Sequence, residues 1–247
     1  MIPGIGTALA LIALYAVGVQ IASAVIAALL GPLWFWRSLL LGEPVLLAWL
    51  APFLRRYDLR ALGLRPVSWR EGVVVALWFQ AIAIAMDAVV LWLAPPALVR
   101  SYLASFHPAS LWEWLALGTV AVVLAPTLEE LLFRGVLLAA LRRHFRLPTA
   151  VLGSAVLFAL VHIKPVQIVA ALPLGWMLGH YVARGGSLYV TIVAHMAGNG
   201  LSLLGLLLPG MPWISASWRP SDTEGLLALV LAAVLLTTFA RRPLPNG

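Results

Sequence analysis

Three short stretches in the second half of the chain place polar side chains with catalytic potential inside apolar sequence. They are Glu129-Glu130-Leu-Leu-Phe-Arg134, Phe158-Ala-Leu-Val-His162 and His195-Met-Ala-Gly-Asn199. A carboxylate can take a proton from water, and a nearby imidazole can orient that water or share the proton. An imidazole and a carboxamide can donate hydrogen bonds to the oxyanion that develops on a carbonyl group. These residue types therefore suit the hydrolysis of an acyl bond.

Direct attack by water is favoured over a covalent intermediate. The chain has no cysteine, and no serine stands in the G-x-S-x-G setting of a nucleophile elbow. We interpret Ser154 and Ser202 as hydroxyl groups that pack between helices.

The two adjacent glutamates have different expected roles. Neighbouring residues on a helix point about 100° apart, so Glu129 and Glu130 face different surroundings. Glu130 and Arg134 are four residues apart and can pair on one face, each offsetting the burial of the other. Glu129 is then left without a local counter-ion, in surroundings of low dielectric that suit a proton acceptor. The alternative is that all three residues form a structural knot that fixes helix packing.

A metal site is the main rival within the enzyme class. Glu129, His162 and His195 could supply three zinc ligands and leave a fourth position open, with Glu130 as the remaining base. The H-E-x-x-H signature of many zinc enzymes is absent, and the ligands would come from three separate helices. We therefore favour chemistry without a metal or other cofactor.

The composition assigns the chain to the integral membrane proteins. Of its 247 residues, 63% are hydrophobic and 10% charged, with a mean hydropathy of +1.01, whereas soluble domains carry roughly 25% charged residues. The net charge of +7 comes from basic residues spread between apolar stretches, so no nucleic-acid partner is expected.

Apolar stretches of bilayer length predict an all-α, polytopic transmembrane bundle of about eight helices. Because the second and fifth are short, six or seven spans remain an alternative. We expect one integral membrane domain over residues 1–247, with residues 111–205 as its motif-bearing catalytic core. The predicted spans are 8–30, 38–54, 72–93, 111–141, 147–161, 166–183, 187–208 and 225–240.

The distribution of basic residues predicts the orientation of this bundle. With eight spans, eleven arginines fall on one side and four basic residues on the other, which places both termini in the cytoplasm by the positive-inside rule. The first group is Arg55, Arg56, Arg60, Arg65, Arg70, Arg142, Arg143, Arg146, Arg184, Arg241 and Arg242; the second is Arg37, Arg100, Lys164 and Arg219.

Helix geometry brings the candidate groups to a similar depth. At about 1.5 Å of rise per residue, Glu129 lies about 20 Å from the span end at Arg142, and His162 lies about 22 Å into the next span. His195 and Asn199 lie about 12 and 18 Å into a third span, one turn apart on one face.

Other polar positions within the spans have less specific interpretations. Glu43 is expected either near the interface or bonded to a neighbouring helix, and Asp87 is either a hydrogen-bond partner or a substrate contact. The G-x-x-x-G pair Gly175 and Gly179 is interpreted as a helix-packing feature.

At the three motifs the sequence resembles a known family. These are the CAAX-protease and bacteriocin-processing (CPBP) intramembrane proteases, also described as type II CAAX prenyl endopeptidase-like or lysostaphin-resistance-protein-A-like proteins. Their hallmarks, E-E-x-x-x-R, F-x-x-x-H and H-x-x-x-N, appear here in that order over roughly residues 111–205.

The resemblance implies an intramembrane endopeptidase of the glutamate type with a site that opens toward the cytoplasm. It implies Glu129 as general base, Glu130 and Arg134 as its support, His162 as the residue that orients water, and His195 with Asn199 as the oxyanion hole. The substrate would be a membrane-associated protein or peptide, prenylated or lipid-anchored in some members. The chain is most similar to prokaryotic members, which predicts the plasma (inner) membrane of a prokaryote.

Two functions from other classes compete with this prediction. A non-catalytic membrane immunity or scaffold protein would keep the polar groups for stability alone. A proton-coupled transporter would use Glu129 and the histidines as a relay, although we detect no inverted repeat of the kind that many transporters contain.

Overall fold

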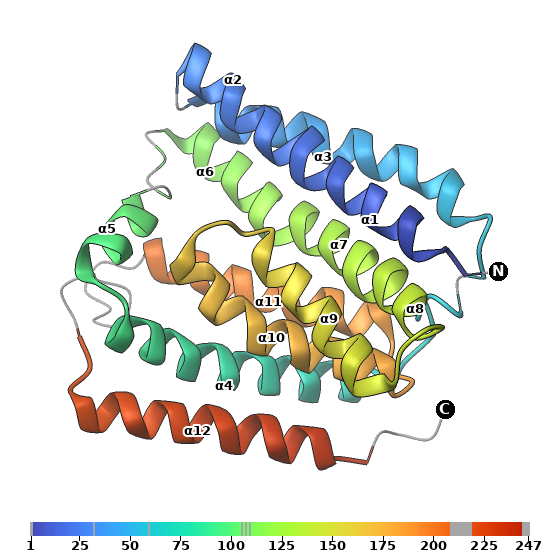
Figure 1. Cartoon of the computed structure of the whole chain (residues 1–247). Helices are drawn as coiled ribbons and strands as arrows, with labels where there is room; N and C mark the ends of the chain where they lie inside the picture. The colour runs from blue at the N-terminus through green and yellow to red at the C-terminus, as the bar shows by residue number, and fades with distance from the viewer. Residues whose placement is uncertain are drawn as a thin grey trace.

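The computed structural model describes residues 2–31, 33–58, 60–104, 106, 108, 110–207 and 219–243. These residues form helices joined by turns and short loops, and no strand occurs among them. The predicted all-α bundle is therefore confirmed (Figure 1).

Consecutive elements join into two long continuous rods, which contain the three π-helical segments labelled η among the described residues. The first rod is α1 (Ile5–Ala13), η1 (Leu14–Ile21) and α2 (Ala22–Leu30), followed by α3 (Leu33–Leu54), α4 (Trp69–Leu93) and the short α5 (Pro96–Ala104). A second rod is α6 (Leu111–Gly118), η2 (Thr119–Leu124), α7 (Ala125–Glu129), η3 (Glu130–Leu137) and α8 (Leu138–Leu141). The remaining helices are α9 (Leu147–Leu160), α10 (Pro165–Ala183), α11 (Leu188–Leu207) and α12 (Asp222–Arg241).

Each of the eight predicted spans largely coincides with a helix, apart from Leu208 of the seventh span, which lies outside the described residues, but the helices differ in length. Within the described part of the chain, seven helices are long and apolar enough to cross a membrane. The exception is α9, whose 14 residues reach only about 21 Å at the usual helical rise. The second predicted span is longer than expected because α3 begins at Leu33, and α5 is a helix that the hydropathy pattern did not predict.

Polar caps define where several helices begin. The hydroxyl groups of Ser68, Ser110 and Ser221 each accept a hydrogen bond from a backbone N–H in the first turn of α4, α6 and α12. At α12 the side chain of Glu224 returns a bond to the backbone of Ser221, completing a capping box. Such caps satisfy N–H groups that the helix itself leaves unpaired.

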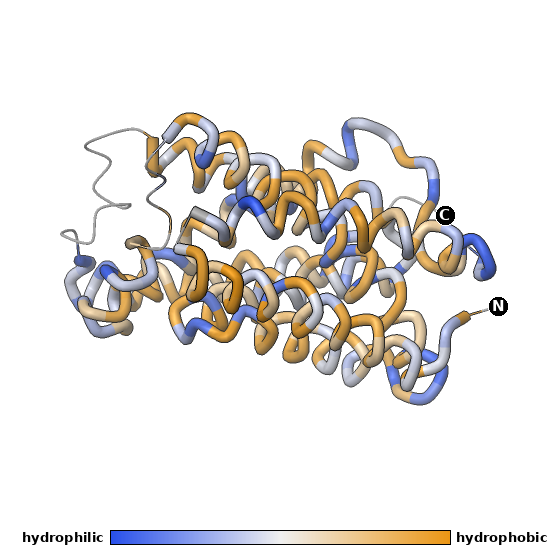
Figure 2. Tube along the Cα trace, turned by 90° about the horizontal axis from the view of Figure 1, so that it is seen from above, coloured by the Kyte–Doolittle hydropathy of each residue, from blue (hydrophilic) through white to orange (hydrophobic). Residues whose placement is uncertain are grey.

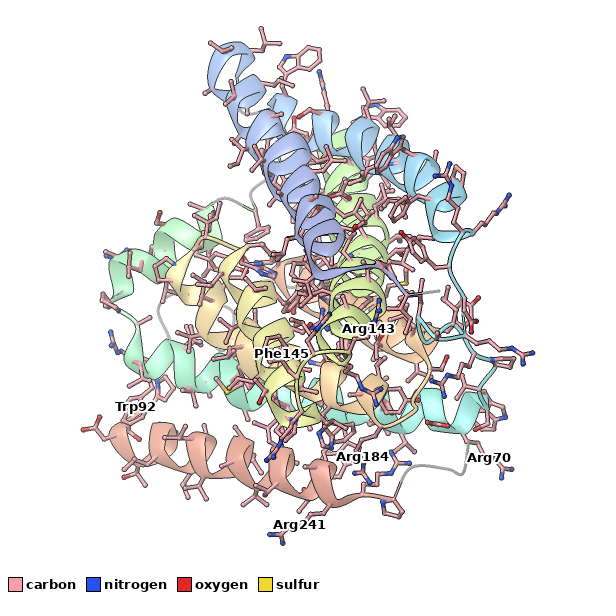
Figure 3. The ribbon with its side chains drawn as sticks, turned by 45° about the vertical axis from the view of Figure 1, so that its right-hand side comes forward. Arg70, Trp92, Arg143, Phe145, Arg184 and Arg241 are labelled. Carbon is pink, nitrogen blue, oxygen red and sulfur yellow. The ribbon has the colours of Figure 1, made fainter. Side chains whose placement is uncertain are left out.

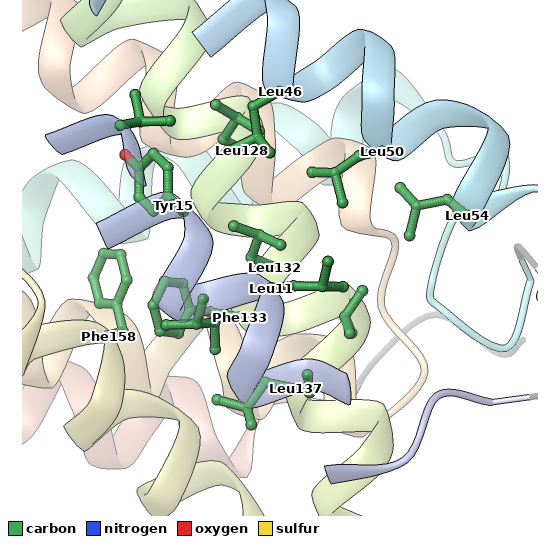
Figure 4. Packing of buried hydrophobic residues seen from close by; sticks show 14 of the residues in the cluster. Leu11, Tyr15, Leu46, Leu50, Leu54, Leu128, Leu132, Phe133, Leu137 and Phe158 are labelled. Carbon is green, nitrogen blue, oxygen red and sulfur yellow. The ribbon is translucent and has the colours of Figure 1, made fainter. Parts of the chain in front are cut away.

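Two clusters of buried side chains hold the helices together. Figure 4 shows the first, in which Leu11 and Tyr15 of the N-terminal rod and Leu46 of α3 pack against Leu128 and other side chains of α7 and η3. The second cluster joins α4, α10, α11 and α12. The motif-bearing rod therefore lies between an N-terminal helical pair and the C-terminal helices.

Hydrophobic residues run along the helices, and hydrophilic residues gather mainly toward the two ends of the bundle (Figure 2). At one end, which we call the arginine-rich end, Arg65 donates to the carbonyl oxygen of Gly185 and Arg184 to that of Ala240. At the other, arginine-poor end, the indole of Trp92 donates to Asp222 (2.9 Å). Figure 3 shows Trp92 and Arg241 at opposite ends of α12.

Candidate active site

The two motif glutamates lie where α7 passes into the π-helical turn η3. Glu129 is 8% exposed and Glu130 is fully buried. The predicted pair is present, with Nη1 of Arg134 lying 2.9 Å from Oε1 of Glu130 and both side chains buried. π-Helical turns often occur at functional sites, and this one carries the motif from Glu130 to Arg134, directly after Glu129 at the end of α7.

Arg134 is held by two further neighbours. Its guanidinium carbon lies 3.9 Å from the centroid of the Phe158 ring, a geometry in which the aromatic face attracts the cation. A Cβ atom at Gly175 would lie 2.8 Å from a ring carbon of Phe158 and 3.2 Å from Nη2 of Arg134. The first glycine of the G-x-x-x-G pair thus leaves room for the stacked arginine and phenylalanine.

His195 lies between the two glutamates. Its Nδ1 is 3.0 Å from Oε1 of Glu130, and its Nε2 is 3.8 Å from Oε2 of Glu129. Because an ionised carboxylate only accepts hydrogen bonds, Nδ1 must carry a proton in the bond to Glu130. Nε2 therefore accepts in the neutral ring and donates only when both ring nitrogens are protonated.

The orientation of His162 is set by its own helix. Its Nδ1 lies 2.8 Å from the carbonyl oxygen of Phe158, and since a carbonyl oxygen can only accept, Nδ1 carries the proton. In the neutral ring Nε2 is then free to accept a proton or a hydrogen bond from water. The Phe158 ring touches both imidazoles, at centroid distances of 4.8 Å to His162 and 5.9 Å to His195.

A sharp turn follows His162. The backbone N–H of Lys164 donates to the carbonyl oxygen of His162 (2.6 Å), and Ile163 has a φ of 63°. A left-handed conformation is unusual for a β-branched residue, and such outliers gather at functional sites. The turn reverses the chain into α10 and keeps His162 at the end of α9.

Asn199 projects from α11 one turn beyond His195. Its Nδ2 donates to the carbonyl oxygen of Ala121 in η2 (2.7 Å). One amide hydrogen is therefore engaged with the motif-bearing rod, and the second is left for another acceptor. Gly198 permits this arrangement, because a Cβ atom there would collide with the ring of Phe79 on α4.

A cavity of about 130 Å³ brings most of the predicted residues together. Its volume suffices for several water molecules. Of the predicted site residues, the described part of its wall includes Arg134, His162, His195 and Asn199. Glu129 is not among these wall residues and lies next to Nε2 of His195.

Further polar residues line the cavity at its other end. They are Asp87 of α4, Tyr102 of α5, Gln167 of α10 and Ser202 of α11. Burial, with the Asp87 carboxylate nearby, raises the pKa of Tyr102 to about 12, so the phenol remains a hydrogen-bond donor at neutral pH. Of these four residues, the sequence pattern had marked Asp87 alone as a substrate contact.

A polar chain from the N-terminal helices ends on Glu129. The Tyr15 hydroxyl donates to Oε1 of Glu129 (3.1 Å), and Nε2 of Gln20 donates to the Tyr15 oxygen (2.9 Å). Gln20 also lies within 3.4 Å of Oε1 of Glu43, which is fully buried. Glu43 is therefore bonded to a neighbouring helix. Tyr15 and Gln20 were not predicted from the sequence as site residues. Gln20 could have been noticed, because it is a polar residue within the apolar span 8–30.

The alternative metal set is not assembled. Among the residues that the structure describes, no three histidine, aspartate or glutamate side chains are placed so that they could hold a metal ion. Glu129, His162 and His195 share a region without forming a set of ligands.

A known protein family matches the part of the chain that contains the three motifs. Residues 110–201 match the sequence model of a family described as type II CAAX prenyl endopeptidase Rce1-like, and this confirms the resemblance that the three motifs indicated. No curated protein matches the chain, and no solved structure matches it. The seven candidate spans support an integral membrane protein, and residues 110–201 are similar to proteases of the CAAX type.

Proposed function

We propose that the protein is an intramembrane endopeptidase in which Glu129 activates a water molecule for attack on a peptide bond of a membrane-associated substrate. The observation that carries this proposal is the position of His195, whose ring joins Glu129 and Glu130 and faces the cavity shared with His162 and Asn199. Two imidazoles and a carboxamide thus border one space that can hold water, with the Glu129 carboxylate next to one of the imidazoles.

The reaction can be followed proton by proton. Oε2 of Glu129 takes a proton from water as the water oxygen bonds to the scissile carbonyl carbon, with His162 Nε2 accepting a second hydrogen bond from that water. The carbonyl oxygen becomes an oxyanion that accepts hydrogen bonds from the Asn199 amide and, when both ring nitrogens of His195 carry protons, from its Nε2–H. Glu129 then gives its proton to the leaving nitrogen as the C–N bond breaks. The products are one amine and one carboxylic acid, which then releases its proton to water as it ionises.

Glu130 and Arg134 position these groups. The carboxylate of Glu130 accepts from Nδ1 of His195, and the ion pair with Arg134 compensates for its burial. Nε2 of His195 is thereby directed toward Glu129 and the cavity. Neither residue needs to exchange a proton for this role.

The proposal includes a metal-free mechanism and a membrane-associated protein or peptide as substrate. Extensive chelation tests the first point, because activity that survives removal of divalent metals is expected here and lost activity would favour a zinc enzyme. Prenylated or lipid-anchored substrates fit a site surrounded by bilayer-length helices.

One observation favours a proton-coupled transporter as an alternative. Hydrogen bonds connect Glu43 to Glu129, and such a polar chain could carry protons between the two carboxylates. The amide of Gln20 interrupts this chain, because an amide donates hydrogen bonds but does not readily pass on a proton. Uptake driven by a pH gradient in proteoliposomes would favour transport. A non-catalytic immunity or scaffold role predicts that Glu129→Gln leaves the phenotype unchanged.

The proposal is tested by comparing membrane proteomes of cells that carry the wild type or Glu129→Gln. Protein termini that appear only with the wild type are expected and would identify substrates. The matched control is Glu224→Gln, an exposed cap of α12 at which glutamine can replace the capping bond. Identical termini in all three strains would contradict a protease.

A further inference from the structure

The residues that line the cavity become more exposed from one of its ends to the other. Phe79, Ala83 and Asp87 lie four residues apart on α4, so they share one face, and all three line the cavity. Phe79 is buried, Ala83 is half-buried and Asp87 is exposed. The eight residues from Phe79 to Asp87 correspond to about 12 Å of helix. Exposure thus increases along α4 toward its C-terminus.

The opposite walls show the same gradient. On α11, His195 and Gly198 are buried, Asn199 is half-buried and Ser202 is exposed. On α10, which runs the other way, Leu178 is buried. The closed end therefore lies at His195 and Leu178, and the mouth lies near Asp87 and Ser202.

The mouth of the cavity is lined by polar side chains. A carboxylate, a phenol, an amide and a hydroxyl group surround it, on Asp87, Tyr102, Gln167 and Ser202. Exposing an ionisable group to hydrocarbon costs several kcal/mol on most scales, so such groups normally face protein or water. The cavity therefore opens to an aqueous space.

The mouth lies toward the arginine-poor end of the bundle. It is formed by the C-terminal halves of α4 and α11, and α4 continues from Asp87 to Trp92, which bonds to Asp222 at that end. The N-terminus of α4, at Arg70, lies at the arginine-rich end. The positive-inside rule predicts that this arginine-rich end faces the cytoplasm.

We propose that substrates enter the cavity from the extracytoplasmic side, as peptide segments exposed outside the cytoplasmic face. The entry of substrates rests on the proposed protease function. The side of the membrane on which the cavity opens does not depend on that function. An extracytoplasmic opening differs from the cytoplasmic opening that the family resemblance implies. The Asp87 carboxylate at the mouth favours segments with basic or hydrogen-bond-donating side chains.

Because the natural chain contains no cysteine, single cysteines can report the position of the mouth. Ser202→Cys on α11 and Ala83→Cys on α4 place thiols on two walls of the cavity. His144→Cys marks the loop after α8 at the arginine-rich end, and Ser154→Cys marks a buried site that is 1% exposed. Each variant of the full chain is treated with a membrane-impermeant maleimide in intact spheroplasts, in inside-out vesicles and after denaturation.

We expect Ser202→Cys and Ala83→Cys to gain one maleimide per chain in intact spheroplasts, and His144→Cys to gain it only in inside-out vesicles. Ser154→Cys should react only after denaturation. Labelling of the cavity cysteines from the cytoplasmic side alone, or in the denatured protein alone, would overturn the proposal. A variant that fails to fold is recognised by loss of the purified monodisperse protein, and the other wall position then provides the result.

Failure of this proposal can be told apart from failure of the protease proposal. The labelling pattern needs no turnover, so it is measured again in the Glu129→Gln background, where we expect it unchanged. Extracytoplasmic labelling without any substrate cleavage would support the proposed entrance and contradict the protease function. Substrate cleavage together with cytoplasmic labelling would support the protease function and contradict the proposed entrance.

Discussion

The hydroxyl group of Tyr15 donates a hydrogen bond to Oε1 of Glu129 at 3.1 Å, between residues 114 positions apart in the chain. Tyr15 is 1% exposed, in the π-helical turn of the N-terminal rod. The bond occupies one carboxylate oxygen of Glu129 and leaves Oε2 on the side of His195. The first helices therefore belong to the site, although the recognisable motifs begin more than a hundred residues later.

Replacing Tyr15 by phenylalanine should slow cleavage without unfolding the protein. The variant keeps the packed ring and removes only the hydroxyl group that orients Glu129. A hydrogen bond to a charged group contributes about 1.5–3 kcal/mol, which corresponds to roughly ten- to a hundredfold in kcat. The rate is measured on a peptide identified in the proteome comparison. Tyr189→Phe, at a tyrosine that is 53% exposed, is the control and should match the wild type; equal rates for both variants would contradict the role of Tyr15.

The two glycines of the G-x-x-x-G pair should respond differently to alanine. Gly175→Ala places a methyl group 2.8 Å from the Phe158 ring, and overpacking of this kind costs about 1–3 kcal/mol of stability. At Gly179 the nearest atom would be a methyl carbon of Val151 at 3.5 Å, an ordinary contact. Thermal unfolding in detergent should show a lower Tm for Gly175→Ala alone. A lower Tm for Gly179→Ala alone would disprove the arrangement around Arg134.

Removing one partner of the buried ion pair between Glu130 and Arg134 should lower the folding stability more than removing both charges does. Arg134→Gln leaves Glu130 as an uncompensated buried carboxylate and is expected to cost about 3–5 kcal/mol of folding stability. The double variant Glu130→Gln with Arg134→Met removes both charges and should recover much of the Tm. It should not recover full cleavage, because Nδ1 of His195 then donates to a neutral amide oxygen, which holds the ring more weakly than a carboxylate does. Recovery of full activity in the double variant would show that this positioning is not needed.

His162 should tolerate glutamine better than asparagine. The asparagine amide lies near the position of Nδ1 and the glutamine amide near that of Nε2. Since Nδ1 is already bonded to the Phe158 carbonyl, the atom available to water is Nε2. We expect His162→Gln to retain more of the cleavage rate than His162→Asn, at similar Tm values. The opposite order would place the functional nitrogen at Nδ1.

Local features of the sequence were sufficient to predict several parts of this structure. The spacing of Glu130 and Arg134 fixes their neighbourhood on any helix, and the structure has the pair at 2.9 Å. Long apolar stretches likewise define helices, because the bilayer leaves few alternatives for the backbone. The i and i+4 spacing of His195 and Asn199 placed both on the wall of one cavity.

Contacts between distant helices could not be predicted in this way. The bond from Tyr15 to Glu129 depends on how the first rod packs against α7, and nothing near Tyr15 in the sequence specifies that partner. The position of Glu129 beside His195, outside the described cavity wall, depends on how α7 packs against α11. The short α5, with Tyr102 near Asp87, was missed because its nine residues lack the length and hydropathy of a span.

The central claim is that the Glu129 carboxylate activates water for peptide hydrolysis. The most direct test compares purified wild type and Glu129→Gln in proteoliposomes, with a peptide whose cleavage depends on the protein and with both proteins shown to have the same Tm. We predict cleavage by the wild type and its loss, by orders of magnitude, in the variant. Cleavage by Glu129→Gln at the wild-type rate would contradict the account.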